Sequence, residues 1–138
     1  MIQSAGVIVI DKTPTGPKVL CVRAYANWDF PKGTLDKNES HQKAAIRELE
    51  EETTLTLADV SLSGVKAPSI TYGSGKKKKQ ATYFLSTRIS DKSPFLPINP
   101  ELGKPENDEY RWVRLSELLE LMPKRLVPVV QFVCAQFP

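Results

Sequence analysis

The chain has 138 residues, a formal net charge of +3, two cysteines and a single histidine. A chain of this length fills one domain, residues 1–138, and buries about two thirds of its unfolded surface. One histidine excludes a Cys/His zinc site, and Cys21 and Cys134 lie in apolar runs that favour buried, reduced thiols. No signal peptide opens the chain and no apolar run approaches a membrane span, so we expect a cytoplasmic protein without a membrane partner.

In chain order, residues 3–10 and 18–24 are rich in β-branched side chains and are separated by a Pro- and Gly-containing turn. This pattern is typical of a β-hairpin, and residues 28–30 add a further short strand. Turn residues over 33–40 lead into a helix over about 39–53, which a short polar side chain near its start would cap.

The rest of the chain alternates strands and helices around one irregular segment. Four prolines between residues 94 and 105 predict a loop without regular structure. The remaining predicted elements are strands over 60–71, 80–90 and 110–113, a helix over 117–122 capped by Ser116, and a helix over 124–137. This order indicates an α/β fold with a mixed sheet between helices.

The net positive charge of the chain is local. Residues 76–79 are four consecutive lysines, and without them 15 basic residues face 16 acidic ones. The glycines and serine before this run and the strand after it predict a hairpin loop. Such a loop can simply keep a strand edge from aggregating, or it can meet the phosphates of a nucleotide or of RNA.

Three carboxylates converge on one face of the helix over about 39–53. Glu48, Glu51 and Glu52 lie at positions i, i+3 and i+4, which share one turn. Like charges this close repel each other unless a cation lies between them, and Mg²⁺ or Mn²⁺ prefers oxygen ligands of this kind. The sequence therefore predicts a divalent metal site on this helix.

The segment from residue 33 to residue 55 resembles the signature of the Nudix hydrolases, G-x5-E-x7-R-E-U-x-E-E-x-G-U, with U apolar. The matching residues are Gly33, Glu39, Arg47, Glu48, Leu49, Glu51, Glu52 and Leu55. Thr54 stands where the family has glycine, whose positive φ a β-branched residue resists, so we expect the helix exit to differ. The resemblance implies a Nudix α/β/α sandwich with a loop-helix catalytic box. It also implies an ion pair between Glu39 and Arg47.

The resemblance further implies hydrolysis of a nucleoside diphosphate linked to another moiety. Glu48 and Glu52 would hold the principal ion, Mg²⁺ or Mn²⁺, together with the Gly33 carbonyl. Glu51 and Glu106 would hold further ions or activate water, and the sequence leaves open which of the two is the general base.

Residues outside this box narrow the range of expected substrates. The motif WDFPKG at residues 28–33 resembles one in asymmetric diadenosine tetraphosphate hydrolases and one in mRNA decapping enzymes, and its Lys32 would contact phosphate. Glu106 lies six residues before Trp112, where the tetraphosphate hydrolases carry a metal-binding glutamate; Asp108 and Glu109 are its rivals.

Tyr72, Lys79 and Tyr83 resemble the tyrosine and lysine set with which the tetraphosphate hydrolases hold adenine and phosphates. Diadenosine tetraphosphate, cleaved to ATP and AMP, is therefore the first expected substrate. The alternatives are an RNA 5′ end, a diphosphoinositol polyphosphate, and a non-catalytic Nudix-like binding module. A monomer or a homodimer is expected.

Overall fold

The computed structural model describes residues 1–138 and contains a mixed β-sheet built around long strands. β1 (Ile2–Thr13) pairs antiparallel with β2 (Gly16–Ala24) and parallel with β7 (Lys79–Arg88). β10 (Glu109–Arg114) lies outside β2 and β5 (Val60–Lys66) lies outside β7, which gives the order β10-β2-β1-β7-β5. The predicted N-terminal hairpin and the mixed sheet are confirmed.

Short strands attach the connecting segments to this sheet. β3 (Asn27–Asp29) pairs with β2, and β6 (Ile70–Tyr72) pairs with β7. β4 (Lys32–Thr34), which the sequence did not predict, pairs with the first half of β1 and so fixes Lys32 and Gly33 against the sheet.

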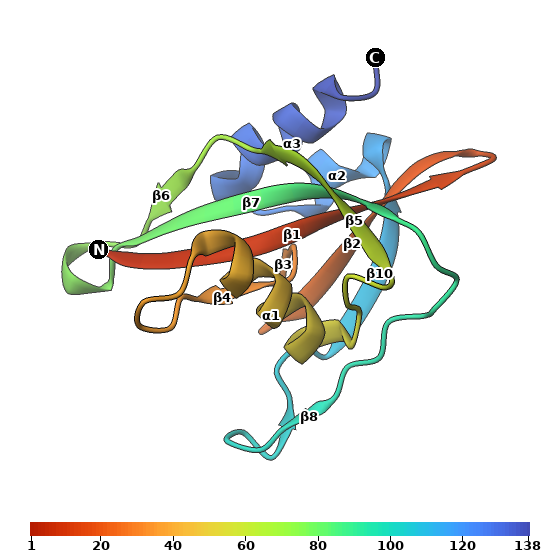
Figure 1. The fold of residues 1–138 in the computed structure, drawn as a ribbon. Coiled ribbons are helices and arrows are strands. Elements are labelled where there is room, and N and C mark those ends of the chain that lie inside the picture. Colours follow the sequence, from red (N-terminus) through yellow and green to blue (C-terminus); the bar gives the residue numbers. More distant parts are fainter.

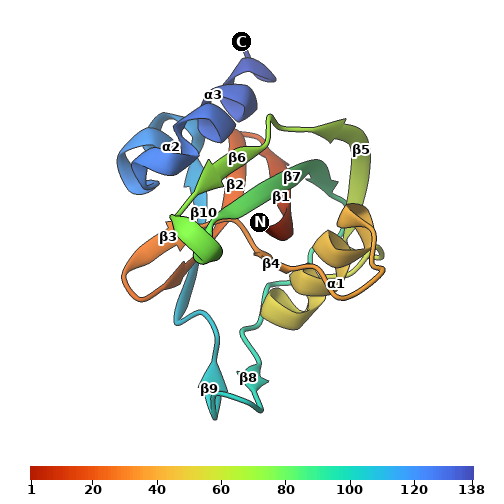
Figure 2. The ribbon, with the colours of Figure 1, turned by 90° about the vertical axis from the view of Figure 1, so that its left-hand side faces the viewer.

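Helices cover both faces of the sheet, as Figures 1 and 2 show: α1 (His41–Thr53) lies on one face, and α2 (Leu115–Leu121) and α3 (Val127–Ala135) lie on the other. β1 serves both layers because its side chains alternate between them. Val7 and Val9 pack with Ala45 and Leu49 of α1, whereas Ile8 and Ile10 join the core that contains α3. The predicted α/β/α sandwich is therefore confirmed.

Several predicted boundaries were wrong for reasons that the backbone makes clear. The strand over 60–71 divides into β5 and β6 because Pro68, between them, lacks the N–H that a strand needs. Gly64, with a φ of 81°, lies at an irregularity in register within β5. The proline-rich segment, predicted to lack regular structure, contains a short hairpin of two-residue strands, β8 (Ile98–Asn99) and β9 (Lys104–Pro105).

The C-terminal helices also differ from the prediction. Ser116 does not cap α2, which already begins at Leu115 without a side-chain cap. The last helix divides into a 3₁₀ turn over Lys124–Leu126 and α3, because Pro128 is tolerated only in the first turn of an α-helix.

Both cysteines are free, as predicted, but only Cys21 is buried, and Cys134 is half-buried. Burial raises the pKa of the Cys21 thiol far above its usual value, so this thiol is inert at neutral pH. No helix of the structure combines the length and apolarity needed to cross a bilayer.

Candidate active site

Helix α1 presents its carboxylates because its opposite side is anchored. Ser40 caps the helix by accepting a hydrogen bond from the Lys43 backbone N–H at 3.2 Å. Ala44, Ala45 and Leu49 are buried against the sheet. Glu48 and Glu52 therefore point along the side of the helix that meets the loops, and only 8% and 6% of their surfaces remain exposed.

Glu106 joins these two carboxylates from the loop before β10. One carboxylate oxygen of each of Glu48, Glu52 and Glu106 lies within 4.8 Å of the others. The two rivals of Glu106 are engaged elsewhere, since Asp108 pairs with Arg23 at 2.9 Å and Glu109 pairs with Arg111 at 2.7 Å. The structure thus brings the predicted Glu106 into the cluster and leaves Asp108 and Glu109 out of it.

Two further groups hold Glu52 in place. The side-chain amide of Asn107 donates to Glu52 Oε1 at 2.7 Å, and the Lys32 backbone N–H donates to Oε2 at 3.1 Å. β4 can approach the helix closely because residue 33 is glycine: a Cβ there would overlap the carboxyl group of Glu48. The predicted metal-binding Gly33 therefore lies against Glu48, in the same cleft.

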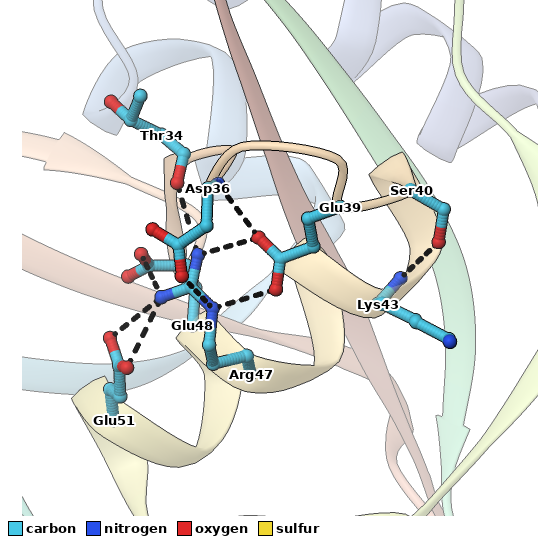
Figure 3. A network of polar contacts seen from close by, with 8 residues as sticks. All are labelled: Thr34, Asp36, Glu39, Ser40, Lys43, Arg47, Glu48 and Glu51. Atoms are coloured by element: carbon cyan, nitrogen blue, oxygen red, sulfur yellow. Dashed lines mark hydrogen bonds and ion pairs between the residues drawn. The ribbon is translucent and has the colours of Figure 1, made fainter.

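Arg47 links the loop to the helix, as Figure 3 shows. Its Nε and Nη2 donate to the two oxygens of Glu39, both at 2.9 Å, which confirms the predicted ion pair. Its Nη1 also donates to Glu48 at 2.9 Å and to Glu51 at 3.1 Å. The hydrogen bonds from Arg47, and then the one from the Asp36 backbone N–H, lower the pKa of Glu39 to about 2. Glu51 is exposed and lines the cleft, but it lies outside the three-carboxylate cluster.

The electrostatics of the cluster fit a divalent cation. Burial, followed by the charge of Glu106, raises the pKa of Glu52 well above its usual value. Loss of surrounding water likewise raises the pKa of Glu48 and of Glu106. Arg47 pairs with Glu48, but no basic side chain forms an ion pair with Glu52 or Glu106. Three close carboxylates with incomplete neutralisation offer the oxygen-only donor set that Mg²⁺ or Mn²⁺ prefers.

The cluster lies in an open cleft of about 800 Å³. Its walls include Lys32 from β4 and Lys79 from the start of β7, and residues 97–101, which include β8, close another side. The lysine run forms the predicted loop between β6 and β7, and of its four members only Lys79 lines the cleft. Two of the predicted phosphate contacts therefore face the carboxylate cluster.

A half-buried aspartate, Asp29, lies beside Lys32. Asp29 accepts from Arg125 at 2.8 Å and from the Tyr83 hydroxyl at 2.8 Å, and it lies 3.8 Å from the Lys32 ammonium. Burial opposes the charge of Lys32, but Asp29 and then Tyr72 outweigh it, so its pKa is raised. Lys32 is therefore cationic at neutral pH.

The two predicted tyrosines differ in position. Tyr83 is fully buried and donates to Asp29, so the prediction that it contacts substrate was wrong, and its role is to support Asp29. Tyr72 is half-buried outside the cleft, with its ring 5.8 Å from the Lys32 ammonium and 4.8 Å from the Arg125 guanidinium. Tyr72 therefore remains a candidate only for an indirect role in substrate binding, through its contact with Lys32.

Sequence reasoning missed three residues of this site: Asn107, Asp29 and Arg125. Asp29 lies inside the WDFPKG motif, so its position next to Lys32 was a usable signal. Asn107 and Arg125 lie 55 and 96 residues from the carboxylates that they contact, and no local pattern marks them.

Together these features define an α/β protein with an acidic loop-helix unit that could hold a divalent ion and that faces two lysines. The model of the NUDIX domain matches residues 2–132. The chain therefore belongs to the Nudix family.

The related sequences and the similar solved structures belong to proteins with different activities. An RNA pyrophosphohydrolase of Teredinibacter turnerae is 32% identical over 97 residues, which are 62% of this chain and 55% of that enzyme, so the chain spans about half the length of that relative. The RNA pyrophosphohydrolase of Pelagibacter ubique is 27% identical over 132 residues, or 87% of this chain and 80% of that enzyme.

Among solved structures, a binary complex of the Caenorhabditis elegans Ap4A hydrolase has a TM-score of 0.87 at 21% identity, covering 99% of this chain and 97% of that one. A MutT protein of Methanosarcina mazei has a TM-score of 0.75 at 23% identity, covering 98% and 94%. At these identities the likeness establishes the Nudix fold.

Proposed function

We propose that this protein is a metal-dependent pyrophosphohydrolase that cleaves a phosphoanhydride bond of a nucleoside polyphosphate. Diadenosine tetraphosphate, cleaved to ATP and AMP, is the first substrate we propose. One observation carries the proposal: the three carboxylates of Glu48, Glu52 and Glu106 face Lys32 and Lys79 across one cleft. A divalent ion on these carboxylates and two ammonium groups beside it would together offset the negative charge of a bound polyphosphate.

Glu48 and Glu52, with the Gly33 carbonyl, would hold Mg²⁺ or Mn²⁺. When bound, a divalent ion offsets charge on phosphate oxygens and lowers the pKa of water. Lys32, fixed by Asp29, would stabilise the negative charge that develops on the phosphate, and Lys79 would bind a neighbouring phosphate.

Hydrogen bonding favours Glu106 over Glu51 as the general base. Both oxygens of Glu51 accept from Arg47, at 3.1 and 3.2 Å, so that carboxylate is already occupied. Glu106 makes no hydrogen bond or ion pair to the protein, so its oxygens are free to accept a proton, and loss of surrounding water raises its pKa. We assign the proton-accepting role to Glu106 and a second metal-binding or charge-balancing role to Glu51.

Cleavage of the 5′ end of RNA is the second candidate. It is supported by the sequence relatives and by residues 76–79, whose exposed lysines continue from Lys79 away from the cleft. A strand of RNA would meet these lysines with several backbone phosphates, whereas a dinucleoside polyphosphate offers only its short phosphate bridge.

A substrate panel with Mg²⁺ tests the proposal: diadenosine tetraphosphate, 5′-triphosphorylated RNA, diphosphoinositol polyphosphate, NADH and ADP-ribose. RNA cleavage by the parent should fall steeply with added salt. The variant with glutamine in place of Lys76, Lys77 and Lys78 should cleave RNA much more weakly, with a shallower salt dependence, and should retain dinucleotide cleavage. The matched control removes the lysines Lys12, Lys66 and Lys124, which lie outside the cleft. If the protein cleaves RNA but not diadenosine tetraphosphate, the first proposed substrate is wrong. If it cleaves no phosphoanhydride in the panel, the proposed activity is wrong.

A further inference from the structure

Asn107 is buried between the loop that ends at Glu106 and the strand that begins at Glu109. Only 6% of its surface is exposed, and its amide Nδ2 donates to Glu52 Oε1 at 2.7 Å. That distance is short for an N–H···O hydrogen bond, as is usual when the acceptor is a carboxylate. Asn107 therefore joins the proline-rich loop directly to a carboxylate of helix α1.

The side chain of Glu106 makes no contact that would hold it in the cluster. It is exposed, and it forms neither a hydrogen bond nor an ion pair with the protein, although its oxygen lies within 4.8 Å of oxygens of Glu48 and Glu52. Repulsion between these carboxylates would push Glu106 away from them. Its position must therefore be set by the backbone on either side of it.

Two neighbours of Glu106 attach that backbone to the rest of the molecule. Asp108 pairs with Arg23 at 2.9 Å, but 58% and 36% of their side chains are exposed, and exposed ion pairs hold geometry weakly. The Asp108 backbone N–H also donates to the Arg23 carbonyl at 2.9 Å, which fixes the side of the loop next to β10. The Asn107 bond is buried and charge-assisted, and it is the contact that ties this segment to helix α1.

The other end of the loop is attached to the same helix. The Phe95 backbone N–H donates to the Thr53 carbonyl at 3.0 Å, and the Lys92 ammonium donates to the Thr54 carbonyl at 2.8 Å. Both ends of the segment between Phe95 and Asn107 are thus fixed to α1, while the β8–β9 hairpin projects between them, as Figure 2 shows.

We propose that Asn107 is a positioning residue: its buried amide ties the loop to Glu52 and so places the Glu106 carboxylate in the metal cluster. The proposal rests on the proposed function, in which Glu106 takes part in hydrolysis. Asn107 itself touches no reacting atom, and it acts through Glu106.

A double-mutant cycle tests this relation. Asn107→Ala should lower kcat about tenfold to a hundredfold, the usual effect of losing a group that orients a metal-binding residue, with little change in KM. In the Glu106→Gln background the same substitution should cost less than about twofold, because the residue through which it acts is already lost. An equal loss in both backgrounds would show that Asn107 acts through Glu52 alone and would overturn the proposal.

Asn107→Asp provides a second variant of unchanged shape that cannot donate to Glu52. It should lower kcat as Asn107→Ala does, whereas Asn107→Ser, which keeps a donor, should recover part of the loss. Asn27→Ala is the matched control, because Asn27 is exposed on β3 and its amide donates only to the Tyr25 carbonyl. Full activity in Asn107→Asp would contradict the proposed role.

A metal-binding readout separates this inference from the proposed activity. Mg²⁺ should raise the Tm of the parent at a concentration about tenfold lower than that required by Asn107→Ala, since Glu106 would no longer contribute its charge. If the parent cleaves no substrate, the proposed function falls and this titration alone decides the inference. Equal Mg²⁺ requirements in the two proteins would then overturn it.

Discussion

Replacing Glu52 with glutamine tests the metal site most directly, because this carboxylate is buried without a basic partner. Its two oxygens accept from the Asn107 amide and from the Lys32 backbone N–H. The glutamine side chain could keep both contacts if the Asn107 amide turned over to present its oxygen. The substitution therefore preserves shape and helix propensity and removes one negative charge from the cluster.

The expected changes in activity and in stability have opposite signs. Turnover should fall on the order of a hundredfold, equivalent to about 2.7 kcal/mol of transition-state stabilisation, because an ion ligand is lost. The metal-free variant should gain about 1–3 kcal/mol, the penalty for a buried group that is incompletely paired. At roughly 3–5 °C per kcal/mol for a chain of this size, the Tm should rise measurably.

The gain should depend on pH in a defined direction. Because the pKa of Glu52 is raised in the folded state, the folded protein holds this proton more tightly than the unfolded chain. The parent is therefore least penalised below the ordinary carboxyl pKa of about 4.3, and it loses stability as the pH rises through the raised value. Glu52→Gln should match the parent near pH 4 and exceed it at pH 8.

Thermal unfolding in a chelator at both pH values, together with turnover at saturating Mg²⁺ and substrate, measures these effects. Glu50→Gln is the control, since Glu50 is exposed on the same helix and forms no ion pair. Near-normal turnover in Glu52→Gln, or a metal-free Tm below that of the parent, would refute the reasoning.

Three single contacts lead to further predictions. Glu39→Gln should destabilise the protein at pH 7. Because the pKa of Glu39 is lowered to about 2, the difference in stability between parent and variant should shrink between pH 4.5 and pH 2. Urea unfolding that shows an undiminished difference at pH 2 would contradict this. Thr54→Gly should raise stability by about 1 kcal/mol by removing Cβ from a left-handed residue, a gain that Thr54→Ala should not reproduce in the same unfolding assay. Glu106→Gln should lower kcat about a hundredfold with little change in KM, while Asp108→Asn should alter neither, and steady-state kinetics showing the reverse order would place the base at Asp108.

The loop-helix box was predictable because its interactions are close in the sequence. Glu39 and Arg47 are eight residues apart, and Glu48 and Glu52 are one helical turn apart, so spacing alone brings each pair together. The strands of β1 and β2 were predictable for a similar reason, since a short turn determines their pairing.

Thr54 shows where such local reasoning failed. We expected a β-branched residue to change the helix exit, but Thr54 adopts the left-handed conformation, with a φ of 65°, that glycine would take. Its N–H donates to the Glu50 carbonyl at 2.9 Å, and its own carbonyl accepts from Lys92 at 2.8 Å. Tertiary contacts therefore impose a backbone conformation that residue preference disfavours.

The support of the site was not predictable, because it depends on contacts between distant residues. Asp29 is one polar residue of a recognisable motif, yet its role depends on Arg125 and Tyr83, which the fold brings to it from 96 and 54 residues away. Tyr83 resembled a substrate contact in the sequence, but in the fold it is buried and donates to Asp29. Long-range register decides which face of a strand a side chain occupies, and a single sequence does not reveal it.

The charge of the cleft bears on how substrate and metal ion bind. Six of its lining residues are acidic and three are basic, and Arg47 is already paired with Glu39, Glu48 and Glu51. A polyphosphate approaching the metal-free cleft would therefore meet a net negative surface, with only Lys32 and Lys79 to attract it. Divalent ions reverse that balance, so substrate affinity and ion affinity must be thermodynamically linked, each raising the other by the same factor. In the proposed reaction the cluster would therefore hold the ion and the phosphate chain together, and residues 76–78, which lie outside the cleft, could contact only the groups attached to that chain.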